Sequence, residues 1–548
     1  MVSYPAKISW PTIPLAVWFW LVGGLGWRTI IAWLLPPGFD EVYYYLYSRH
    51  LHWSYFDHPP IVAVTTGFGW WLTHAITPLT IRLGALGLYV LSLLLLYWLA
   101  EYLFDRKAGI LAVAIASITP LFWITFGLLT APDNALIVFW TLTVLIAAYE
   151  FIPTQVSMLR PDGAIAYTPS PRIVLFGATL GLACLSKYHG FVLGLGLVGF
   201  CLTSNRTRKA LWSPWAALAL LVFLLTLTPL WLWNSQHEWI SFRFHLGLRF
   251  EGGDPTPYRP LDVVGTWLLG VLYLFPTIGF LLWWQVGRSL LQQLQDWLRP
   301  PLTVVEAWGR DRTALILWVS LPIVIGFTLL GGKQAIYPAW PAPGFWGLTL
   351  LLAHAASHWR TKSLRRWLGG TGLVLGTLAI VALLHLSLGL LQKPGNYSLL
   401  GGFVPVEQDG STTLLDITQL RSRVADSPEV IQAMQAADFL FTDEFYLSAY
   451  IDMALYPLQQ QPVTCFSQDP RGFAFWNMPE TWIGQDAIYV TLASLHPNRT
   501  ALINEFRPFF QELEPLQEIP LTRGGAVTET VLVYRAGVMQ QPYHYPYP

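Results

Sequence analysis

Two adjacent acids begin the first polar segment of the chain. The segment GFDEVYYYLYSRHLHWSYFDHPP covers residues 38–60 and opens with Asp40 and Glu41. A carboxylate at the edge of an apolar layer has a raised pKa that suits a general base, so Asp40 is a candidate for this role. Its alternative role is to cap the helix that EVYYYLYSRHL predicts, and the two roles are compatible. Glu41 either orients the acceptor or Asp40, or favours the positive end of the same helix.

Four cations are candidates for binding an anionic ligand such as a phosphate: Lys187, Arg243, Arg249 and Lys333. Guanidinium and ammonium groups suit phosphate oxygens, and the two glycines before Lys333 let backbone N–H groups approach an anion. Lys187 lies between two apolar segments, where an unpaired ammonium is costly. Its partner is therefore either a phosphate or Asp133, which the predicted topology places on the same face.

The candidates for contacting the substrate are three aromatic and three polar residues: Tyr188, Tyr337, Trp340, Asp57, His58 and Asp133. The aromatic side chains could stack on a substrate, although interfacial aromatics commonly anchor membrane proteins. Asp57 and His58 close the first polar segment. Their alternative role is to pair with each other and to rigidify the Pro-Pro turn that follows.

The composition indicates the class of protein that positions these residues. The chain of 548 residues is 54% hydrophobic and 12% charged, with a mean hydropathy of +0.45. A soluble protein carries roughly 25% charged residues, so we predict a polytopic α-helical membrane protein. Eleven apolar segments are the predicted crossings, at residues 12–35, 79–103, 108–126, 133–151, 173–186, 188–203, 212–233, 263–285, 313–330, 337–355 and 367–391. The first is too long for a signal peptide and is predicted to stay uncleaved.

Basic residues in the short loops set the orientation. Under the eleven-helix count, the clusters at 106–107, 206–209, 310–312 and 360–366 share one face, which we predict to be cytoplasmic. The first polar segment therefore lies outside, within a predicted loop over 36–78, as does a second long loop over 234–262 that we expect to act as a lid. Seven cations also fall outside: Arg49, Arg82, Lys187, Arg243, Arg249, Arg259 and Lys333. They require either an anionic ligand or pairing with nearby acids.

The last part of the chain has a different character. Between residue 400 and the end there are 17 acids and seven arginines. The segments DFLFTD, PVTCF, DAIYVT and TVLVYRA alternate with amphipathic stretches such as SPEVIQAMQAA and RTALINEFRPFF. We predict that residues 1–391 form the transmembrane domain and that residues 392–548 form a soluble, extracytoplasmic α/β domain. This domain has no nucleophile motif or phosphate loop, so we expect it to position the acceptor or cover the site.

Several motifs resemble one known superfamily. FDEVYYYLYSRHLHWSYFDHPPIVA, TAPDNAL (130–136), LSKYHGFVL (185–193), WNSQHEWISFRFHLGLRF (233–250) and GGKQAIYPAWPAP (331–343) are similar, in that order, to motifs of GT-C fold, polyprenyl-phosphate-sugar-dependent glycosyltransferases. Specifically, they are similar to motifs of bacterial members of the protein mannosyltransferase and aminoarabinose transferase superfamily. The tail FTDEFYLSAYIDMALY resembles the extracytoplasmic domain of some of them.

The resemblance implies transfer of a sugar from a polyprenyl-phosphate donor to a glycolipid, polymer or protein on the outer face of the cytoplasmic membrane. It identifies Asp40 with the first acid of the family's Asp-Glu motif. Asp57 matches an acidic position that contributes to a metal site in the aminoarabinose transferases, and His245 is the nearest candidate for the second ligand. His58 stands where those enzymes carry a lysine, and the spacing to Arg249 differs by one residue. A divalent metal such as Zn or Mg thus stays an open option, and we expect no other cofactor.

Two other classes of protein remain as alternatives. A transporter or flippase of a lipid-linked anion also needs charged residues between apolar helices. Against it, the charges gather at one face instead of mid-membrane. A binding protein anchored by its helices would not need so many of them. The expected partners are the lipid-linked donor, membrane lipids and the acceptor, with no nucleic acid.

Overall fold

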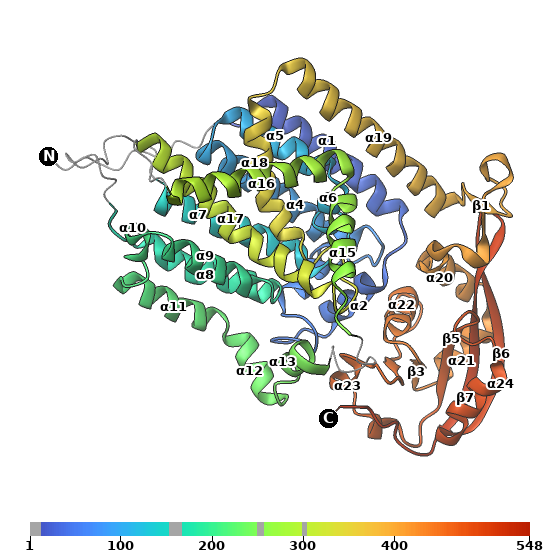
Figure 1. Cartoon of the computed structure of the whole chain (residues 1–548). Helices are drawn as coiled ribbons and strands as arrows, with labels where there is room; N and C mark the ends of the chain where they lie inside the picture. The colour runs from blue at the N-terminus through green and yellow to red at the C-terminus, as the bar shows by residue number, and fades with distance from the viewer. Residues whose placement is uncertain (1–11, 153–166, 249–256, 299–303, 548) are drawn as a thin grey trace.

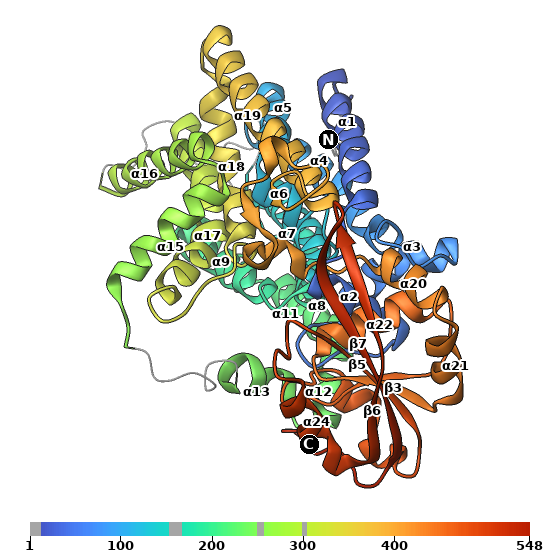
Figure 2. The same ribbon diagram turned by 90° about the vertical axis from the view of Figure 1, so that its right-hand side faces the viewer.

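A computed structural model of the chain describes residues 12–152, 167–248, 257–298 and 304–547. The first part is a set of long helices, and the last part is a mixed α/β unit that lies at one end of them (Figures 1 and 2). The helices that form along the predicted apolar segments are α1 (Leu15–Leu34), η1 (Thr80–Arg82), α4 (Leu83–Leu103), α5 (Arg106–Ile118), α6 (Pro120–Thr125), α7 (Pro132–Phe151), α8 (Arg172–Ser186), α9 (Gly190–Leu202), α11 (Pro214–Thr226), α12 (Thr228–Gln236), α15 (Pro260–Tyr273), α16 (Pro276–Leu298), α17 (Val304–Leu330), α18 (Ala342–Ser357) and α19 (Thr361–Leu388).

Fewer helices of the described chain meet a strict length criterion for crossing a membrane than the eleven predicted segments. Five helices of the described chain are long and apolar enough to cross a membrane, or up to seven if each bent pair is one span. The chain is thus a helical, multi-pass membrane protein, and the predicted count of eleven is not confirmed. The segment predicted over 263–285 is bent by 118° between α15 and α16. Phe275 adopts a φ of 72° there, and the following Pro276 prevents a continuous helix.

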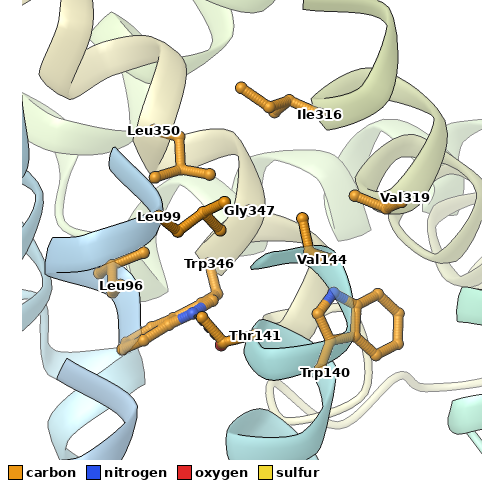
Figure 3. Close-up of a pocket in the computed structure, with 10 residues that line it drawn as sticks. All are labelled: Leu96, Leu99, Trp140, Thr141, Val144, Ile316, Val319, Trp346, Gly347 and Leu350. Carbon is orange, nitrogen blue, oxygen red and sulfur yellow. Dashed lines mark hydrogen bonds between the residues drawn. The ribbon is translucent and has the colours of Figure 1, made fainter. Parts of the chain in front are cut away.

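The centre of the helical part is closely packed. Helices α4, α7, α17 and α18 meet there, and the indole N–H of Trp346 donates to the hydroxyl of Thr141 at 2.9 Å. The apolar side chains around Trp140 and Trp346 leave a space of only about 10 Å³ between them (Figure 3). A space of this size holds at most about one water molecule. This region is therefore a scaffold and not a ligand site.

The C-terminal unit contains a five-stranded sheet in the order β4-β3-β5-β7-β6. Its strands are β3 (Phe439–Thr442), β4 (Val463–Cys465), β5 (Ala487–Leu492), β6 (Phe510–Arg523) and β7 (Ala526–Met539). Its α-helices are α20 (Ile417–Ala425), α21 (Pro428–Ala436), α22 (Phe445–Leu455), α23 (Phe473–Trp476) and α24 (Arg499–Phe506). Strand β3 pairs in parallel with β4 and β5, whereas β7 runs antiparallel to both β5 and β6. A separate parallel pair, β1 (Gln392–Lys393) with β2 (Val404–Pro405), follows α19.

Four of the five sheet strands lie where the sequence predicts them, and β6 is the exception. Its sequence is polar and contains Pro515 and Pro520, which weaken a strand prediction. Strand β6 lies at the edge of the sheet, where proline is tolerated, and its pairing with β7 is interrupted between Pro515 and Gln517.

The polar segment predicted as an outside loop over 36–78 forms two helices, α2 (Phe39–Arg49) and α3 (Ile61–Thr73). Helix α2 lies beside α22 of the C-terminal unit in both views (Figures 1 and 2). Side chains of the two helices share one hydrophobic core. The phenolic O–H of Tyr450 also donates to the carbonyl oxygen of Pro37 at 2.6 Å. The first polar segment is therefore held between the membrane helices and the C-terminal unit.

Candidate active site

Helix α2 turns its two acids in different directions. Gly38, and not Asp40, is the N-cap residue, so the capping role considered for Asp40 is wrong. Among the described residues, no group donates a hydrogen bond to the Asp40 carboxylate, and the residue keeps an exposed surface. The protein around the carboxylate partly dehydrates it, and this raises its pKa, opposed by the positive charge of Arg471. Asp40 is thus an accessible carboxylate with the raised pKa that a general base requires.

Glu41 is buried and saturated with donors. The Arg82 side chain donates from Nε at 2.8 Å and from Nη2 at 2.6 Å, and the backbone N–H groups of Gly38 and Thr130 donate at 2.8 and 3.0 Å. The remaining Arg82 N–H groups reach carbonyl oxygens at the end of α1, including that of Leu35 at 2.7 Å. These contacts favour a positioning role for Glu41, because they join α2 to α1, to Arg82 and to the segment before α7. The ion pair with Glu41 also gives Arg82 its partner, so this cation does not require an anionic ligand.

Asp57 is also buried, and both of its carboxylate oxygens are engaged. One accepts a hydrogen bond from the hydroxyl of Tyr47, and the other contacts Nη1 of Arg471 at 3.3 Å. Neither of these two contacts involves His58, whose ring lies 5.4 Å from that of Tyr44 and 6.2 Å from that of His245. Asp57 therefore connects the first polar segment to the C-terminal unit.

The predicted metal ligands do not fit a metal site. Nε2 of His245 lies 2.7 Å from the backbone oxygen of Asp57, and not from its carboxylate. Hydrogen bonding to a carbonyl requires a proton on that nitrogen, which then has no lone pair for a metal. Within the described ranges, no three His, Cys, Asp or Glu side chains are grouped as metal ligands would be. A cation, Arg471, already balances the Asp57 carboxylate.

Lys187 and Asp133 form a buried ion pair. The ammonium lies 2.9 and 2.7 Å from the two oxygens of Asp133, which lies in the first turn of α7, while Lys187 is the C-cap residue of α8. Asp133, the alternative to a phosphate as the partner of Lys187, is thus paired with it. Its charge still acts on Asp40, so this pair lies on the same side of the molecule as the candidate base.

The other predicted phosphate ligands are less well placed. Arg243 follows α12 in α13 (Ile240–Arg243) and makes a loose 3.5 Å pair with Glu238, both side chains being exposed. Lys333 is exposed after the end of α17, and Arg249 lies outside the described residues. The lid predicted over 234–262 is described only in part, because residues 249–256 also lie outside those ranges.

The predicted aromatic residues divide into two places. Tyr188 contacts the His245 ring edge-on at 4.8 Å, near Asp57. Tyr337 and Trp340 contact each other at 5.5 Å beyond α17, and Tyr337 is exposed. Tyr188 is therefore the aromatic candidate that the structure brings to the site.

Sequence reasoning missed the contributions of the C-terminal unit. Arg49, at the end of α2, contacts Asp452 at 2.8 Å, and Arg471 contacts Asp57. These partners are about 400 residues apart in the sequence, so no local pattern connects them. The one available signal was Arg471 itself, a single cation in the short turn QDPRGF of an acidic domain.

A cavity of about 620 Å³ lies elsewhere, between α9, α16 and α17. Its walls include Trp318, Leu321 and Ile325, with Arg310 and Asp311 at one end. None of the candidate site residues named above lines it. The site around Asp40 is therefore defined by its side chains and not by this cavity.

The fold and the grouped charges define a class: a multi-pass helical membrane protein with an accessible carboxylate beside a C-terminal α/β unit. Residues 57–233 match the family of dolichyl-phosphate-mannose-protein mannosyltransferases. The chain is 24% identical over 325 residues to the lipid A galacturonosyltransferase RgtD of Rhizobium johnstonii, covering 57% of this chain and 59% of that relative. The match thus spans less than two thirds of the relative's length.

Two solved structures have the same fold. ArnT from Cupriavidus metallidurans in the apo state aligns with a TM-score of 0.56 at 15% identity, covering 94% of this chain and 98% of that one. The same protein bound to undecaprenyl phosphate gives 0.53 at 16% identity, covering 94% and 97%. These findings confirm the resemblance that the sequence motifs indicate: the chain has the GT-C fold of the polyprenyl-phosphate-dependent glycosyltransferases.

Proposed function

We propose that the protein is a glycosyltransferase that moves a sugar from a polyprenyl-phosphate donor to an acceptor on the outer face of the cytoplasmic membrane. The observation that carries this proposal is Asp40, a carboxylate without a hydrogen-bond donor among the described residues, in a setting where every neighbouring acid is paired. Its raised pKa suits removal of a proton from an acceptor hydroxyl or amine. The polyprenyl phosphate is itself the leaving group, so the donor needs no nucleotide.

The remaining residues take supporting roles in this proposal. Lys187 is the most deeply placed cation for the departing phosphate, with Asp133 holding it in place until the donor binds. Arg243 and Lys333 are exposed cations that can reach a headgroup at the membrane surface. Tyr188 is placed to stack against a sugar or the first isoprene unit.

The similarity to a lipid A galacturonosyltransferase makes lipid A the first acceptor to test. The wild-type chain and Asp40→Asn are expressed in the same bacterial host, and lipid A and the other envelope glycolipids are analysed by mass spectrometry. We expect a sugar increment with the wild type that Asp40→Asn lacks. The size of the increment identifies the sugar as a hexose, uronic acid, pentose or amino sugar.

A second measurement separates a transferase from a lipid transporter. Native mass spectrometry of both purified proteins with added undecaprenyl phosphate should show equal binding, since Asp40 acts on the acceptor. The proposal is wrong if Asp40→Asn still produces the increment. It is also wrong if neither glycolipids nor envelope proteins gain a sugar when the wild type is present.

A further inference from the structure

The turn after β4 carries one arginine in an unusual backbone conformation. Arg471 has a φ of 46°, and such left-handed residues other than glycine persist where the surroundings hold them. The next residue supplies that hold, because the N–H of Gly472 donates to the Tyr43 hydroxyl at 2.9 Å. A Cβ at Gly472 would lie 2.7 Å from Trp476 and 3.0 Å from the Tyr43 oxygen. The turn is thus fitted closely against α2.

The Arg471 side chain is held from three directions. Nη1 contacts Asp57 at 3.3 Å, Nε contacts Asp469 at 3.3 Å, and the guanidinium lies 3.8 Å from the centre of the Phe445 ring. Nη2 makes no hydrogen bond to any residue that the structure describes. The side chain is 24% exposed. Its guanidinium is therefore fixed in orientation and partly open.

Arg471 also faces the helix that carries Asp40. Asp40, Tyr43 and Tyr47 lie three and seven residues apart and so share one face of α2. The guanidinium lies 5.9 Å from the Tyr43 ring, and Asp57 accepts from Tyr47. The largest charge effects on Asp40 come from four groups: Arg471 and Lys187 lower the pKa of its carboxyl, while Asp57 and Glu41 raise it. Of these four, Glu41 and Lys187 have their own partners in Arg82 and Asp133.

We propose that Arg471 is a positioning residue of the active site, supplied by the C-terminal unit, whose guanidinium fixes Asp57 and provides the positive charge facing Asp40. It takes the place at Asp57 where the family resemblance had suggested a metal ion. The inference rests on the proposed role of Asp40 as the base. It makes the C-terminal unit part of the catalytic site and not merely a cover or a docking module.

The test measures the protonation of Asp40 directly. Dicyclohexylcarbodiimide reacts with protonated carboxyl groups, so labelling of Asp40 against pH, located by peptide mass spectrometry, gives the pH of half-maximal labelling. Loss of an opposite charge near a carboxylate raises its pKa by about one unit or more. We expect Arg471→Met to raise the labelling midpoint by that amount. Arg471→Lys, which keeps the charge, should return it towards the wild-type value.

Arg49→Met is the matched control. Arg49 also joins α2 to the C-terminal unit, through Asp452 at 2.8 Å and the ring of Tyr456 at 3.7 Å, and its charge is not among the largest that act on Asp40. Its loss weakens the same contact between the two parts and should leave the Asp40 midpoint unchanged. If Arg471→Met fails to fold, Arg471→Gln removes the charge and keeps a hydrogen-bond donor.

An unchanged midpoint in the Arg471 variants would overturn the inference, as would an equal shift in Arg49→Met. Sugar transfer by Asp40→Asn, measured in parallel, keeps the two proposals apart. An active Asp40→Asn rejects the proposed base, whereas an inactive Asp40→Asn with an unmoved Arg471 midpoint rejects only the role of Arg471.

Discussion

The two faces of α2 carry adjacent acids with opposite surroundings. On one face Glu41 is buried and accepts four hydrogen bonds, two of them from Arg82. On the other, Asp40 keeps an exposed surface and accepts none from the described residues. A saturated carboxylate cannot take up a proton or bind a substrate without losing its partners, whereas an unsaturated one can. The comparison supports a structural role for Glu41 and the proposed chemical role for Asp40.

The largest effect should come from removing the reactive carboxylate. Asp40→Asn keeps the size of the side chain and removes the base, which contributes a factor of roughly 10²–10⁴ to the rate. We expect sugar transfer to fall by that factor while undecaprenyl phosphate binding stays the same. Asp262→Asn, an exposed acid in a loose 3.9 Å pair with Arg259, is the control and should retain its activity. Equal losses in the two variants would contradict the assignment.

The pH dependence of transfer tests the same carboxylate without mutation. A base must be deprotonated to act, so the rate should fall as the pH drops through the pKa of Asp40. Because burial raises that pKa, the fall should occur above the range of an ordinary aspartate, about 4. A rate that is constant down to that range would contradict the raised pKa.

The next effect lies on the Glu41 face and concerns stability. Arg82→Met leaves the buried Glu41 carboxylate without its partner, and breaking such a pair costs about 3–5 kcal/mol. Unfolding in mixed detergent micelles measures this loss. The double variant Glu41→Met with Arg82→Met removes both charges and should be more stable than Arg82→Met alone. If the double variant is no more stable, the pair does not hold α2 in place.

The same contrast explains what the sequence could predict. The helical membrane class, four strands of the C-terminal sheet and the candidates Asp40, Lys187 and Asp133 follow from hydropathy, alternation and short motifs. The role of Glu41 stayed open because a motif cannot show that Arg82, in another helix, saturates it. Arg471 was missed because its contact with Asp57 depends on how the C-terminal unit docks onto α2. Pairing across such separations is decided by packing, which local patterns do not encode.

The smallest of these effects should come from the ion pair between Lys187 and Asp133, which shares features of both acids of α2. Lys187 is buried and paired like Glu41, yet its charge acts on Asp40. A charge-assisted hydrogen bond contributes about 1.5–3 kcal/mol, so we expect Lys187→Met to weaken undecaprenyl phosphate binding roughly tenfold or more. Asp133→Asn is the matched control, because it frees the ammonium from its partner and leaves it available to a phosphate.

If Lys187 binds the donor, Asp133→Asn should bind undecaprenyl phosphate at least as tightly as the wild type. If the pair is only structural, both variants should lose stability together and neither should change the affinity of the folded protein. Native mass spectrometry and micelle unfolding on the same preparations distinguish the two outcomes. An affinity that falls equally in both variants would place Lys187 with Glu41, among the residues that hold the site without touching the donor.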